Sequence, residues 1–470
     1  MNKHYHFVGI GGIGVGALAA LSLDKGYLVS GSDLRSNQVT ERLKARGAEI
    51  FLGHAGQNIG DADCIVFSSA ISRDNPELIE ARRKRIPVVQ RAKFLAELMQ
   101  GYIGITVAGA HGKTTTTSMA AHLLEKAGLQ PTTAIGGIVN DTYHHAGLGE
   151  GKYFVAEVDE SDGSFLYFRP HYSIITNIDF EHVDYYLKWQ NVLDAYREFI
   201  GKTQDGGIVL AYGDDKPLMN MLKESGRRFR TYGFSRENSI HAANIQFGGF
   251  CSTFDCVIDG KDGGQISLKV PGRVNIANAM ACVGLGVSLS LGLDTIRESL
   301  KSYPGVQRRF QLKQKIDDIW IIDDYAHHPT EIKATLETAQ LFKHSVQEKG
   351  AGRQACRLIA VFQPHRYSRV KGLMDDFAKS LTASDHLIVT DIYAASEKPI
   401  DGVTAEALCQ KIRAISNKPV SYIPKDRIID HLLAIVEPQD MVLTLGAGDI
   451  TRIADEFVKA LKKRSAAAGV

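Results

Sequence analysis

The sequence predicts an α/β protein of three domains, each built around a mainly parallel β-sheet. Apolar strand-like runs alternate with helical segments along most of the 470 residues, which is the pattern of repeated βαβ units. Glycine-rich turns join a strand to a helix at residues 9–16, 109–112 and 446–448. In parallel sheets such turns lie at the carboxyl ends of the strands, where ligands bind. The length also fits about three domains of ordinary size.

The composition is that of a soluble globular protein. A formal net charge of +2 gives no reason to expect a nucleic acid or a membrane surface as a partner, and no apolar run approaches the roughly 18 residues that a membrane helix needs. The six cysteines are scattered without a Cys-x-x-Cys pair. We therefore expect free thiols in a reducing compartment, and a bridge between Cys251 and Cys256 is the less favoured alternative. Residues 1–9 show no signal-peptide pattern, so a cytoplasmic protein is expected. A monomer or weak homodimer is also expected.

The first domain, expected over residues 1–100, opens with a strand, a glycine-rich turn and a helix. Gly9, Gly11 and Gly14 match the G-x-G-x-x-G pattern in that setting. Asp33 ends the next strand, where a dinucleotide-binding fold places an acid on a ribose hydroxyl. The residues alone leave three interpretations open: an NAD pyrophosphate, another diphosphate such as that of a UDP-sugar, or tight packing of strand against helix. The order of elements predicts a Rossmann-like sheet.

The second domain, expected over residues 101–303, carries the strongest motif of the chain. A buried strand leads into the loop 109–114, Gly-Ala-His-Gly-Lys-Thr, and a helix follows. The N–H groups and dipole of such a helix start bind phosphate, Lys113 can reach the β and γ oxygens, and the Thr114 hydroxyl can hold Mg²⁺. Val107 stands where the full P-loop pattern has another glycine. Because strand, loop and helix all fit, the sequence predicts a nucleotide triphosphate site on a P-loop ATPase-type sheet.

Acidic residues follow two further strands of this domain. Glu157 ends one strand, and carboxylates surround His182 after the next. Because the carboxyl ends of parallel strands share the edge that carries the phosphate loop, these groups are placed to bind Mg²⁺. From the residues alone, His182 is equally a second metal ligand or a surface histidine in an acidic loop.

Between residues 239 and 270 the pattern changes to short alternating segments, which predict a small antiparallel β appendage. A helix then opens with Asn275 and Asn278, which lie about one turn apart and share a face. Their amides either contact the nucleotide or cap the start of the helix.

The third domain, expected over residues 304–470, repeats the alternation of strand and helix and is predicted to be Rossmann-like. Polar side chains again follow the strands, and they should cluster at one mouth of the sheet; they include Asp323, Asp324, His327, Arg366 and Arg369. Arginine at such a mouth suits a carboxylate or a phosphate, because guanidinium offers paired donors. Surface ion pairs are the alternative interpretation.

Nearly the whole chain resembles the Mur ligase family, with the motifs in the expected order. The matching stretches are residues 6–14 (HFVGIGGIG), 31–33 (GSD), 68–71 (SSAI), 109–116 (GAHGKTTT), 156–162 (AEVDESD), 271–275 (PGRVN), 308–310 (RRF), 323–330 (DDYAHHPT) and 362–369 (FQPHRYSR). The last two stretches are the most specific.

The resemblance implies an ATP-dependent ligase of peptidoglycan precursor synthesis that joins L-alanine to the lactyl carboxylate of UDP-N-acetylmuramic acid. The carboxylate would attack the γ-phosphoryl group, and the amine would then attack the acyl phosphate. His327 is the candidate base for the amine proton, and stacking on adenine is its equal alternative. Closure of the third domain would exclude water, with Gly104 and residues 303–305 as expected hinges.

The resemblance also implies the site residues. The UDP-sugar would contact Gly11, Gly12, Ile13, Gly14, Asp33, Ser68, Ser69 and Ala70. ATP would contact Gly109, Ala110, His111, Gly112, Lys113, Thr114, Thr115, Asn275, Asn278, Arg309 and Asp323. L-alanine would contact Tyr325, His327, Arg366 and Arg369, and two Mg²⁺ ions would be held by Thr114, Glu157 and His182. The catalytic roles would fall to Lys113, Glu157, His182, His327, Arg366 and Arg369.

Three departures from the family pattern stand out. Val274 replaces a frequent histidine, and Val158 replaces a frequent alanine. Tyr196 to Glu198 occupy the neighbourhood of a carbamylated lysine in related ligases, where Glu198 would supply the charge. Three other functions are weighed against the alanine ligase: a ligase that adds a peptide to the same nucleotide sugar, an NAD-dependent dehydrogenase, and a P-loop regulator whose ATPase drives a change of shape.

Overall fold

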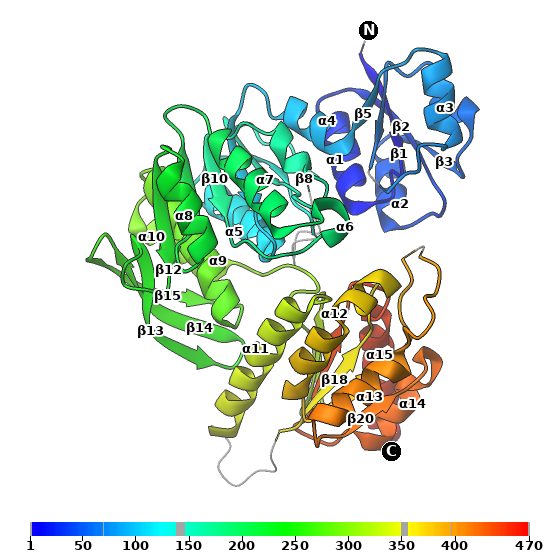
Figure 1. The fold of residues 1–470 in the computed structure, drawn as a ribbon, viewed down its shortest axis with the longest axis vertical. Helices are drawn as coiled ribbons and strands as arrows, with labels where there is room; N and C mark the ends of the chain where they lie inside the picture. The colour runs from blue at the N-terminus through cyan, green and yellow to red at the C-terminus, as the bar shows by residue number, and fades with distance from the viewer. Residues whose placement is uncertain (1, 69, 138–145, 349–355, 396, 469–470) are drawn as a thin grey trace. The chain divides into compact units, whose positions relative to one another are not determined.

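The computed structural model describes residues 2–68, 70–137, 146–348, 356–395 and 397–468. Three sheets of five, ten and six strands are flanked by helices (Figure 1), which confirms the expected α/β class with three sheet-based domains. The chain divides into two compact units. The first comprises Met1–Asn244, Asp255–Ile266 and Ala277–Pro304, and the second comprises Ile245–Phe254, Ser267–Ile276 and Gly305–Val470. The domain limits at 100 and 303 stay a prediction.

The first sheet is entirely parallel, as the βαβ pattern predicts. Its strands, in the order β3-β2-β1-β4-β5, are β1 (His4–Val8), β2 (Leu28–Asp33), β3 (Glu49–Leu52), β4 (Cys64–Phe67) and β5 (Val88–Gln90). The helices are α1 (Ile13–Asp24), α2 (Gln38–Ala45), α3 (Pro76–Arg83) and α4 (Arg91–Leu98). Side chains alternate along β1: Phe7 packs with α1, α2 and α4, while Val8 packs with α3. Helices therefore cover both faces.

A buried carboxylate lies inside this first sheet. Glu77, at the start of α3, is fully buried, and its oxygens accept hydrogen bonds from Ser32 Oγ at 2.6 Å and Asn58 Nδ2 at 2.7 Å. His54 Nδ1 lies at 3.2 Å and His6 Nε2 at 3.7 Å. Burial alone would raise the pKa of Glu77, but the nearby His6 ring and the hydrogen bonds from Ser32 and Asn58 outweigh it and lower the pKa to about 2.

Replacing Glu77 with Gln should remove much of the acid dependence of stability. A carboxyl group whose pKa falls from 4.5 to about 2 on folding contributes stability above pH 4.5, on the order of 3 kcal/mol, which is lost as the pH falls through that interval. Urea unfolding at pH 6 and pH 3.5 should show a clearly smaller difference in Glu77→Gln than in the wild type. Glu80→Gln, on the same helix but paired with Arg83 at the surface, is the matched control. Equal acid dependence in both variants would contradict the assignment.

The second sheet carries the phosphate loop at its centre. Its order is β15-β14-β13-β12-β11-β10-β6-β9-β7-β8. The strands are β6 (Ile103–Ala108), β7 (Thr132–Ala134), β8 (Ala146–Gly147), β9 (Tyr153–Glu157), β10 (Tyr172–Ile175), β11 (Ile208–Tyr212), β12 (Phe229–Gly233), β13 (Ile240–Gly248), β14 (Cys251–Ile258) and β15 (Lys261–Leu268). The strands from β12 to β9 run parallel. Two-residue connections join β13 to β14 and β14 to β15, which only antiparallel neighbours allow, so the expected antiparallel appendage is present.

The helices of this region follow the strands in sequence. They are α5 (Lys113–Lys126), α6 (Val183–Tyr186), α7 (Trp189–Gly201), α8 (Lys216–Glu224), α9 (Arg273–Ser288) and α10 (Leu293–Ser302). The expected hinge at Gly104 is wrong, because this residue lies inside β6 and pairs with Phe154 of β9. A Cβ there would lie 2.8 Å from Met99 Sδ. Gly104 therefore serves close packing.

The third sheet belongs to the second unit and has the order β16-β17-β21-β18-β19-β20. Its strands are β16 (Gln311–Ile316), β17 (Ile319–Asp324), β18 (Leu358–Phe362), β19 (His386–Val389), β20 (Val420–Tyr422) and β21 (Met441–Leu445). Among the described pairings of this third sheet, only the β16–β17 pair is antiparallel. One face packs on α11 (Pro329–Glu348), α12 (Tyr367–Ser380) and α13 (Ala405–Ile415), and the other on α14 (Ile428–Ile435) and α15 (Thr451–Ala468). These three layers confirm the Rossmann-like expectation.

Two simpler expectations can be compared directly with the structure. All six cysteines are free thiols, so no bridge joins Cys251 and Cys256. In the described ranges, every helix is too short or too polar to cross a bilayer.

Candidate nucleotide and substrate sites

The phosphate loop depends on two glycines with left-handed backbones. Gly109 has φ 133° and Gly112 has φ 82°, a region that residues with a Cβ rarely adopt. A Cβ on Gly109 would lie 2.1 Å from Thr176 Oγ1, and one on Gly112 would lie 2.7 Å from Asn278 Oδ1. Gly112 directly precedes α5, so the first free N–H groups of this helix face the loop, as phosphate binding requires.

Asn177, which follows β10, ties this loop to the neighbouring strand. Its Oδ1 accepts from His111 N, and its Nδ2 donates to His111 O, both at 2.9 Å. His111 Nε2 in turn lies 3.0 Å from Asp179 Oδ2. The sequence did not single out Asn177 as a site residue, although its place at a strand end next to β6 was a usable signal.

Lys113, the first residue of α5, is held in place by three acceptors. Its Nζ donates to Gly109 O at 2.6 Å, to Ala110 O at 3.2 Å and to Glu160 Oε1 at 2.9 Å. Burial alone would lower the pKa of Lys113, but the charges of nearby carboxylates, Glu160 first, outweigh it and raise the pKa. The ammonium is therefore charged at every physiological pH.

Thr114 and Glu157 meet directly beside this lysine. Thr114 Oγ1 donates to Glu157 Oε1 at 3.1 Å, and Glu157 Oε2 accepts from Gly136 N at 2.9 Å. A hydroxyl and a carboxylate at the foot of a phosphate loop are the hard oxygen donors that Mg²⁺ prefers. Thr115 follows, nearly buried. The donor set therefore fits the cation that the sequence implied for Thr114 and Glu157.

His182 belongs to a different group of donors from Glu157. Its Nε2 lies 3.5 Å from Glu160 Oε1 and 3.6 Å from Glu181 Oε2, and one ligand-type atom from each of the three side chains falls within 4.8 Å of the others. Burial lowers the pKa of His182, but Glu160 and Glu181 outweigh it, so the pKa lies above its ordinary value. The structure thus splits the expected metal residues into two groups, each with donors suited to a divalent cation.

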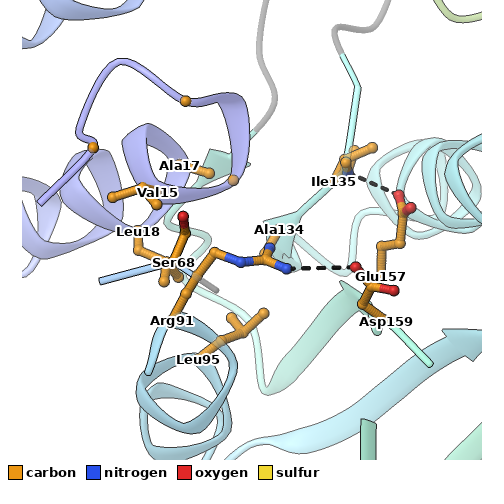
Figure 2. Close-up of a pocket in the computed structure, with 14 residues that line it drawn as sticks. Val15, Ala17, Leu18, Ser68, Arg91, Leu95, Ala134, Ile135, Glu157 and Asp159 are labelled. Carbon is orange, nitrogen blue, oxygen red and sulfur yellow. Dashed lines mark hydrogen bonds and ion pairs between the residues drawn. The ribbon is translucent and has the colours of Figure 1, made fainter. Parts of the chain in front are cut away.

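The glycine loop of the first sheet borders a cavity of about 350 Å³ (Figure 2). Gly12, Gly14 and Ser68 line it, together with Ala134 at the end of β7 and Glu157 at the end of β9. Arg91, the first residue of α4, enters this cavity, and a Cβ on Gly14 would lie 2.6 Å from its Nη1. Its guanidinium also lies 3.9 Å from Asp159 Oδ2. A cation beside a glycine loop suits a diphosphate. The sequence analysis did not predict Arg91 as a site residue, although its position directly after a parallel strand was a usable signal.

The remaining residues expected at the UDP-sugar surround this loop. Asp33 Oδ2 accepts from Gly11 N at 2.9 Å, so the carboxylate closes the glycine turn as well as standing at the end of β2. Ser68 Oγ accepts from Ala70 N at 3.3 Å. Ile13 opens α1 and is partly exposed. Ser69 lies outside the described residues.

In the second unit, aromatic and basic side chains gather at the carboxyl ends of β17 and β18. The guanidinium carbons of Arg308 and Arg309 lie 4.7 and 5.3 Å from the centre of the Tyr325 ring, and this ring contacts His327 with centroids 5.2 Å apart. His327 in turn contacts His365 at 5.7 Å. The structure therefore brings Arg309, Tyr325 and His327 together. Of these three, the sequence placed only His327 in the expected cluster at the mouth of this sheet, and the roles of all three stay a prediction.

His365 links this group to Arg369. Its Nδ1 lies 3.3 Å from Arg369 Nη1, and its ring stacks on Tyr393 with centroids 5.4 Å apart. Burial, followed by the neighbouring side chains of His327, Arg369 and Arg366, lowers the pKa of His365 to about 3. The imidazole is therefore neutral near pH 7 and accepts a hydrogen bond from the guanidinium.

Arg366 has an unusual backbone, with φ 69° and ψ 127° directly before α12. Its Nε lies 2.9 Å from Glu397 Oε1, and Glu397 also accepts from Ser368 N at 3.0 Å and Ser368 Oγ at 2.7 Å. Such strain at a non-glycine residue persists only where the surroundings hold it, and it concentrates at functional sites. Neither Glu397 nor His365 was among the predicted site residues.

Two expectations for the third domain need correction. Asp323 is fully buried, and its oxygens accept from Thr444 at 2.7 Å and Thr451 at 2.6 Å, so the carboxylate serves the sheet rather than facing ATP. Asp324 is also buried rather than at a mouth, and burial raises its pKa to about 6 against the pull of Arg309.

The two asparagines of the α9 region differ in their surroundings. Asn278 lies against Gly112, as its closeness to a Cβ there indicates. Asn275 belongs to the second unit, where its Nδ2 donates to Pro271 O at 2.7 Å. A contact of Asn275 with nucleotide stays a prediction. Glu198 lies on α7 and pairs with Lys202 at 3.1 Å, more than half exposed, so the expectation that it replaces a carbamylated lysine has no support.

A lysine-bearing phosphate loop at the centre of a parallel sheet, with carboxylates at the neighbouring strand ends, defines a nucleotide-binding α/β protein. Comparison with known families then identifies the class. Residues 4–103 match the model described as "Mur ligase family, catalytic domain", residues 107–286 the "Mur ligase middle domain", and residues 308–448 the "Mur ligase, glutamate ligase domain". The chain belongs to the Mur ligase family.

Individual relatives are similar over their full length. The chain is 45% identical over 462 residues to the UDP-N-acetylmuramate–L-alanine ligase of Geotalea daltonii, with 98% of each chain covered, and 44% identical over 461 residues to that of Geobacter sp. (strain M21), again with 98% of each covered. Among solved structures, the UDP-N-acetylmuramate–alanine ligase of Thermotoga maritima matches with a TM-score of 0.83 at 28% identity, covering 98% of this chain and 100% of that one. A murein peptide ligase of Psychrobacter arcticus matches with a TM-score of 0.68 at 25% identity, covering 98% and 99%.

Replacing Gly112 with Ala should abolish nucleotide binding. The new Cβ would displace Asn278 and force a left-handed backbone at a cost of about 1–2 kcal/mol, which distorts the N–H groups that face phosphate. Gly128→Ala is the matched control, because Gly128 follows the same helix with φ 72° and open space around it. Calorimetric titration with ATP and Mg²⁺ should show binding in the control alone, whereas both variants lose similar thermal stability. Binding by Gly112→Ala with wild-type affinity would contradict this account.

Proposed function

We propose that this chain joins L-alanine to the lactyl carboxylate of UDP-N-acetylmuramic acid, with conversion of ATP to ADP and phosphate, in peptidoglycan precursor synthesis. The observation that carries this conclusion is identity of about 44% over 98% of the chain to ligases named for that reaction. The phosphate loop fits the energetics, because a carboxylate at neutral pH is a poor electrophile and must first be phosphorylated.

The alternative of a peptide-adding ligase is less well supported. The murein peptide ligase structure matches at 25% identity with a TM-score of 0.68, against 28% and 0.83 for the alanine ligase structure. A dehydrogenase would not explain the phosphate loop with Lys113 and Thr114. An ATPase regulator would not explain the arginines Arg366 and Arg369 at the carboxyl end of β18. The alanine ligase accounts for all of these features.

In the proposed mechanism, the first step is attack of the lactyl oxygen on the γ-phosphoryl group of ATP. Lys113 carries a permanent positive charge in a nearly buried position, where it stabilises the charge that spreads over the phosphoryl oxygens. Thr114 and Glu157 would hold one Mg²⁺, and Glu160, Glu181 and His182 a second. Such cations neutralise the phosphates and align them.

The UDP end of the substrate is proposed to bind at the glycine loop of the first sheet. Arg91 and the loop from Gly11 to Gly14 would hold the diphosphate, with Asp33 and Ser68 on the side of the uridine. Arg91 pairs weakly with Asp159 in the structure, so its guanidinium can turn to a phosphate without leaving a buried charge unpaired.

L-alanine is proposed to bind through its carboxylate to Arg369, with Arg366 beside it. Its amine must lose a proton before it attacks the acyl phosphate. His327 stays the proposed base, and His365 remains neutral so that it accepts from Arg369 rather than repelling it. We further propose that the protein acts in the cytoplasm, because ATP and UDP-sugars are cytoplasmic. We also propose that it is a monomer or a weak homodimer.

Release of ADP with UDP-N-acetylmuramate, while each amino acid is offered in turn, tests the function directly. Phosphate and ADP should form at the highest kcat/KM with L-alanine, and the sugar product should gain one alanine by mass spectrometry. Lys113→Ala should retain less than about a tenth of the wild-type rate, because the loss of a transition-state charge contact costs at least tenfold. Turnover with a tripeptide but not with alanine would favour the peptide-adding ligase, and phosphate release without any amino acid would favour the regulator.

Replacement of Arg91 and Arg369 by Ala should separate the two substrate sites. Arg91→Ala should raise the KM for UDP-N-acetylmuramate about tenfold or more, since a charge-assisted contact is worth about 1.5–3 kcal/mol, with the alanine KM unchanged. Arg369→Ala should instead raise the alanine KM or slow acyl transfer. Steady-state kinetics with each substrate varied provides the measurement, and each variant is the control for the other. A shift of the same KM in both variants would remove one arginine from its assigned site.

A further inference from the structure

Glu160 is a buried carboxylate with two possible partners. Only 3% of its side chain is exposed. Both of its oxygens lie 2.9 Å from Lys113 Nζ, and Oε1 also lies 3.5 Å from His182 Nε2. Glu181, which completes the second donor group, lies 3.6 Å from the same histidine. The carboxylate therefore stands between the phosphate loop and a group of metal-type ligands.

The lysine in this structure has no free hydrogen-bonding capacity. An ammonium has three N–H donors, and Gly109 O, Ala110 O and Glu160 Oε1 accept one each. To contact a β- or γ-phosphate oxygen, Lys113 must give up one of these acceptors. The two carbonyls belong to the loop that cradles the phosphate, whereas Glu160 is an anion that repels it. Glu160 is thus the partner that leaves.

The backbone of Glu160 is fixed, so only its side chain can move. Its carbonyl oxygen accepts from Tyr186 Oη at 2.6 Å and from Gly163 N at 2.9 Å. A rotation of the side chain away from Lys113 leaves the carboxylate beside His182 and Glu181, where it already has a ligand-type atom within 4.8 Å of theirs. A released, buried carboxylate needs a cation there, because an unpaired buried charge is costly.

The geometry points to Glu160 as a positioning residue that exchanges partners: it holds Lys113 before nucleotide binds, and it joins His182 and Glu181 as a cation ligand once phosphate takes the lysine. This inference rests on the proposed function and adds a coupling to it. Without a divalent cation, binding of the triphosphate breaks the Lys113–Glu160 ion pair and leaves the Glu160 carboxylate unpaired, which weakens nucleotide binding. A cation bound by Glu160, Glu181 and His182 pairs with the released carboxylate and so restores the affinity. Nucleotide and cation affinities are then linked, and by thermodynamic reciprocity each raises the other.

The test is binding of a non-hydrolysable ATP analogue to the full-length protein, by calorimetry, in EDTA and in Mg²⁺. Glu160→Gln should bind the analogue about tenfold more tightly than wild type in EDTA, a difference of 1.4 kcal/mol, because Lys113 is freed in advance. Its gain in affinity on adding Mg²⁺ should shrink. AMP, which lacks the phosphates that a P-loop lysine reaches, should bind both proteins equally in EDTA.

Glu181→Gln is the matched control, since it removes the same charge from a side chain that contacts His182 and His111. It should lose part of the Mg²⁺ gain but keep wild-type affinity in EDTA. In a Lys113→Met background, Glu160→Gln should no longer tighten metal-free binding. If Glu160→Gln unfolds, Glu160→Asp, which retracts the carboxylate, should give a smaller tightening.

Unchanged or weaker metal-free binding by folded Glu160→Gln would overturn the exchange, and so would equal tightening by Glu181→Gln. A wild-type protein that binds no adenine nucleotide under either condition would instead overturn the proposed function.

Discussion

The contact between Lys113 and the phosphate loop is the interaction on which the central site depends. A buried ammonium is stable only when it is paired, and this one is held by two loop carbonyls and a carboxylate. The same contact fixes the path of the loop, so the glycines at 109 and 112 keep their left-handed backbones. The loop is therefore preorganised for phosphate before any nucleotide arrives, which spares the cost of ordering it.

Sheet topology explains why the charged groups converge. The order β10-β6-β9 places the phosphate loop between two strands that end in acids, and parallel pairing brings all three ends to one edge. The third sheet repeats the arrangement, with β17 and β18 ending in the segments that carry His327 and Arg366. Both sheets thus carry polar residues after the carboxyl ends of their strands, which is where ligands bind in parallel sheets of this kind.

Residues of the same type differ in their partners and in their pKa values, because their charged neighbours differ. Glu157 faces Thr114, whereas Glu160 pairs with Lys113. His182 sits among carboxylates that raise its pKa, whereas His365 sits among cations that lower its pKa to about 3. The pKa values of two histidines of the same chain therefore shift in opposite directions, and the neighbours that the fold brings together decide the direction of each shift.

The sequence by itself determined the α/β class, the phosphate loop and the family, because strand periodicity and glycine spacing are local properties that neighbouring residues specify. It also singled out Tyr325, His327 and Arg369 as candidate site residues, because the first two lie in one short motif and the third lies in another. Only the tertiary structure revealed Arg91 and Glu397, and only it moved Asp323 from the site into the sheet core. These outcomes depend on which side chains distant segments bring together, and on how deeply a strand end is buried, and neither can be read from spacing along the chain.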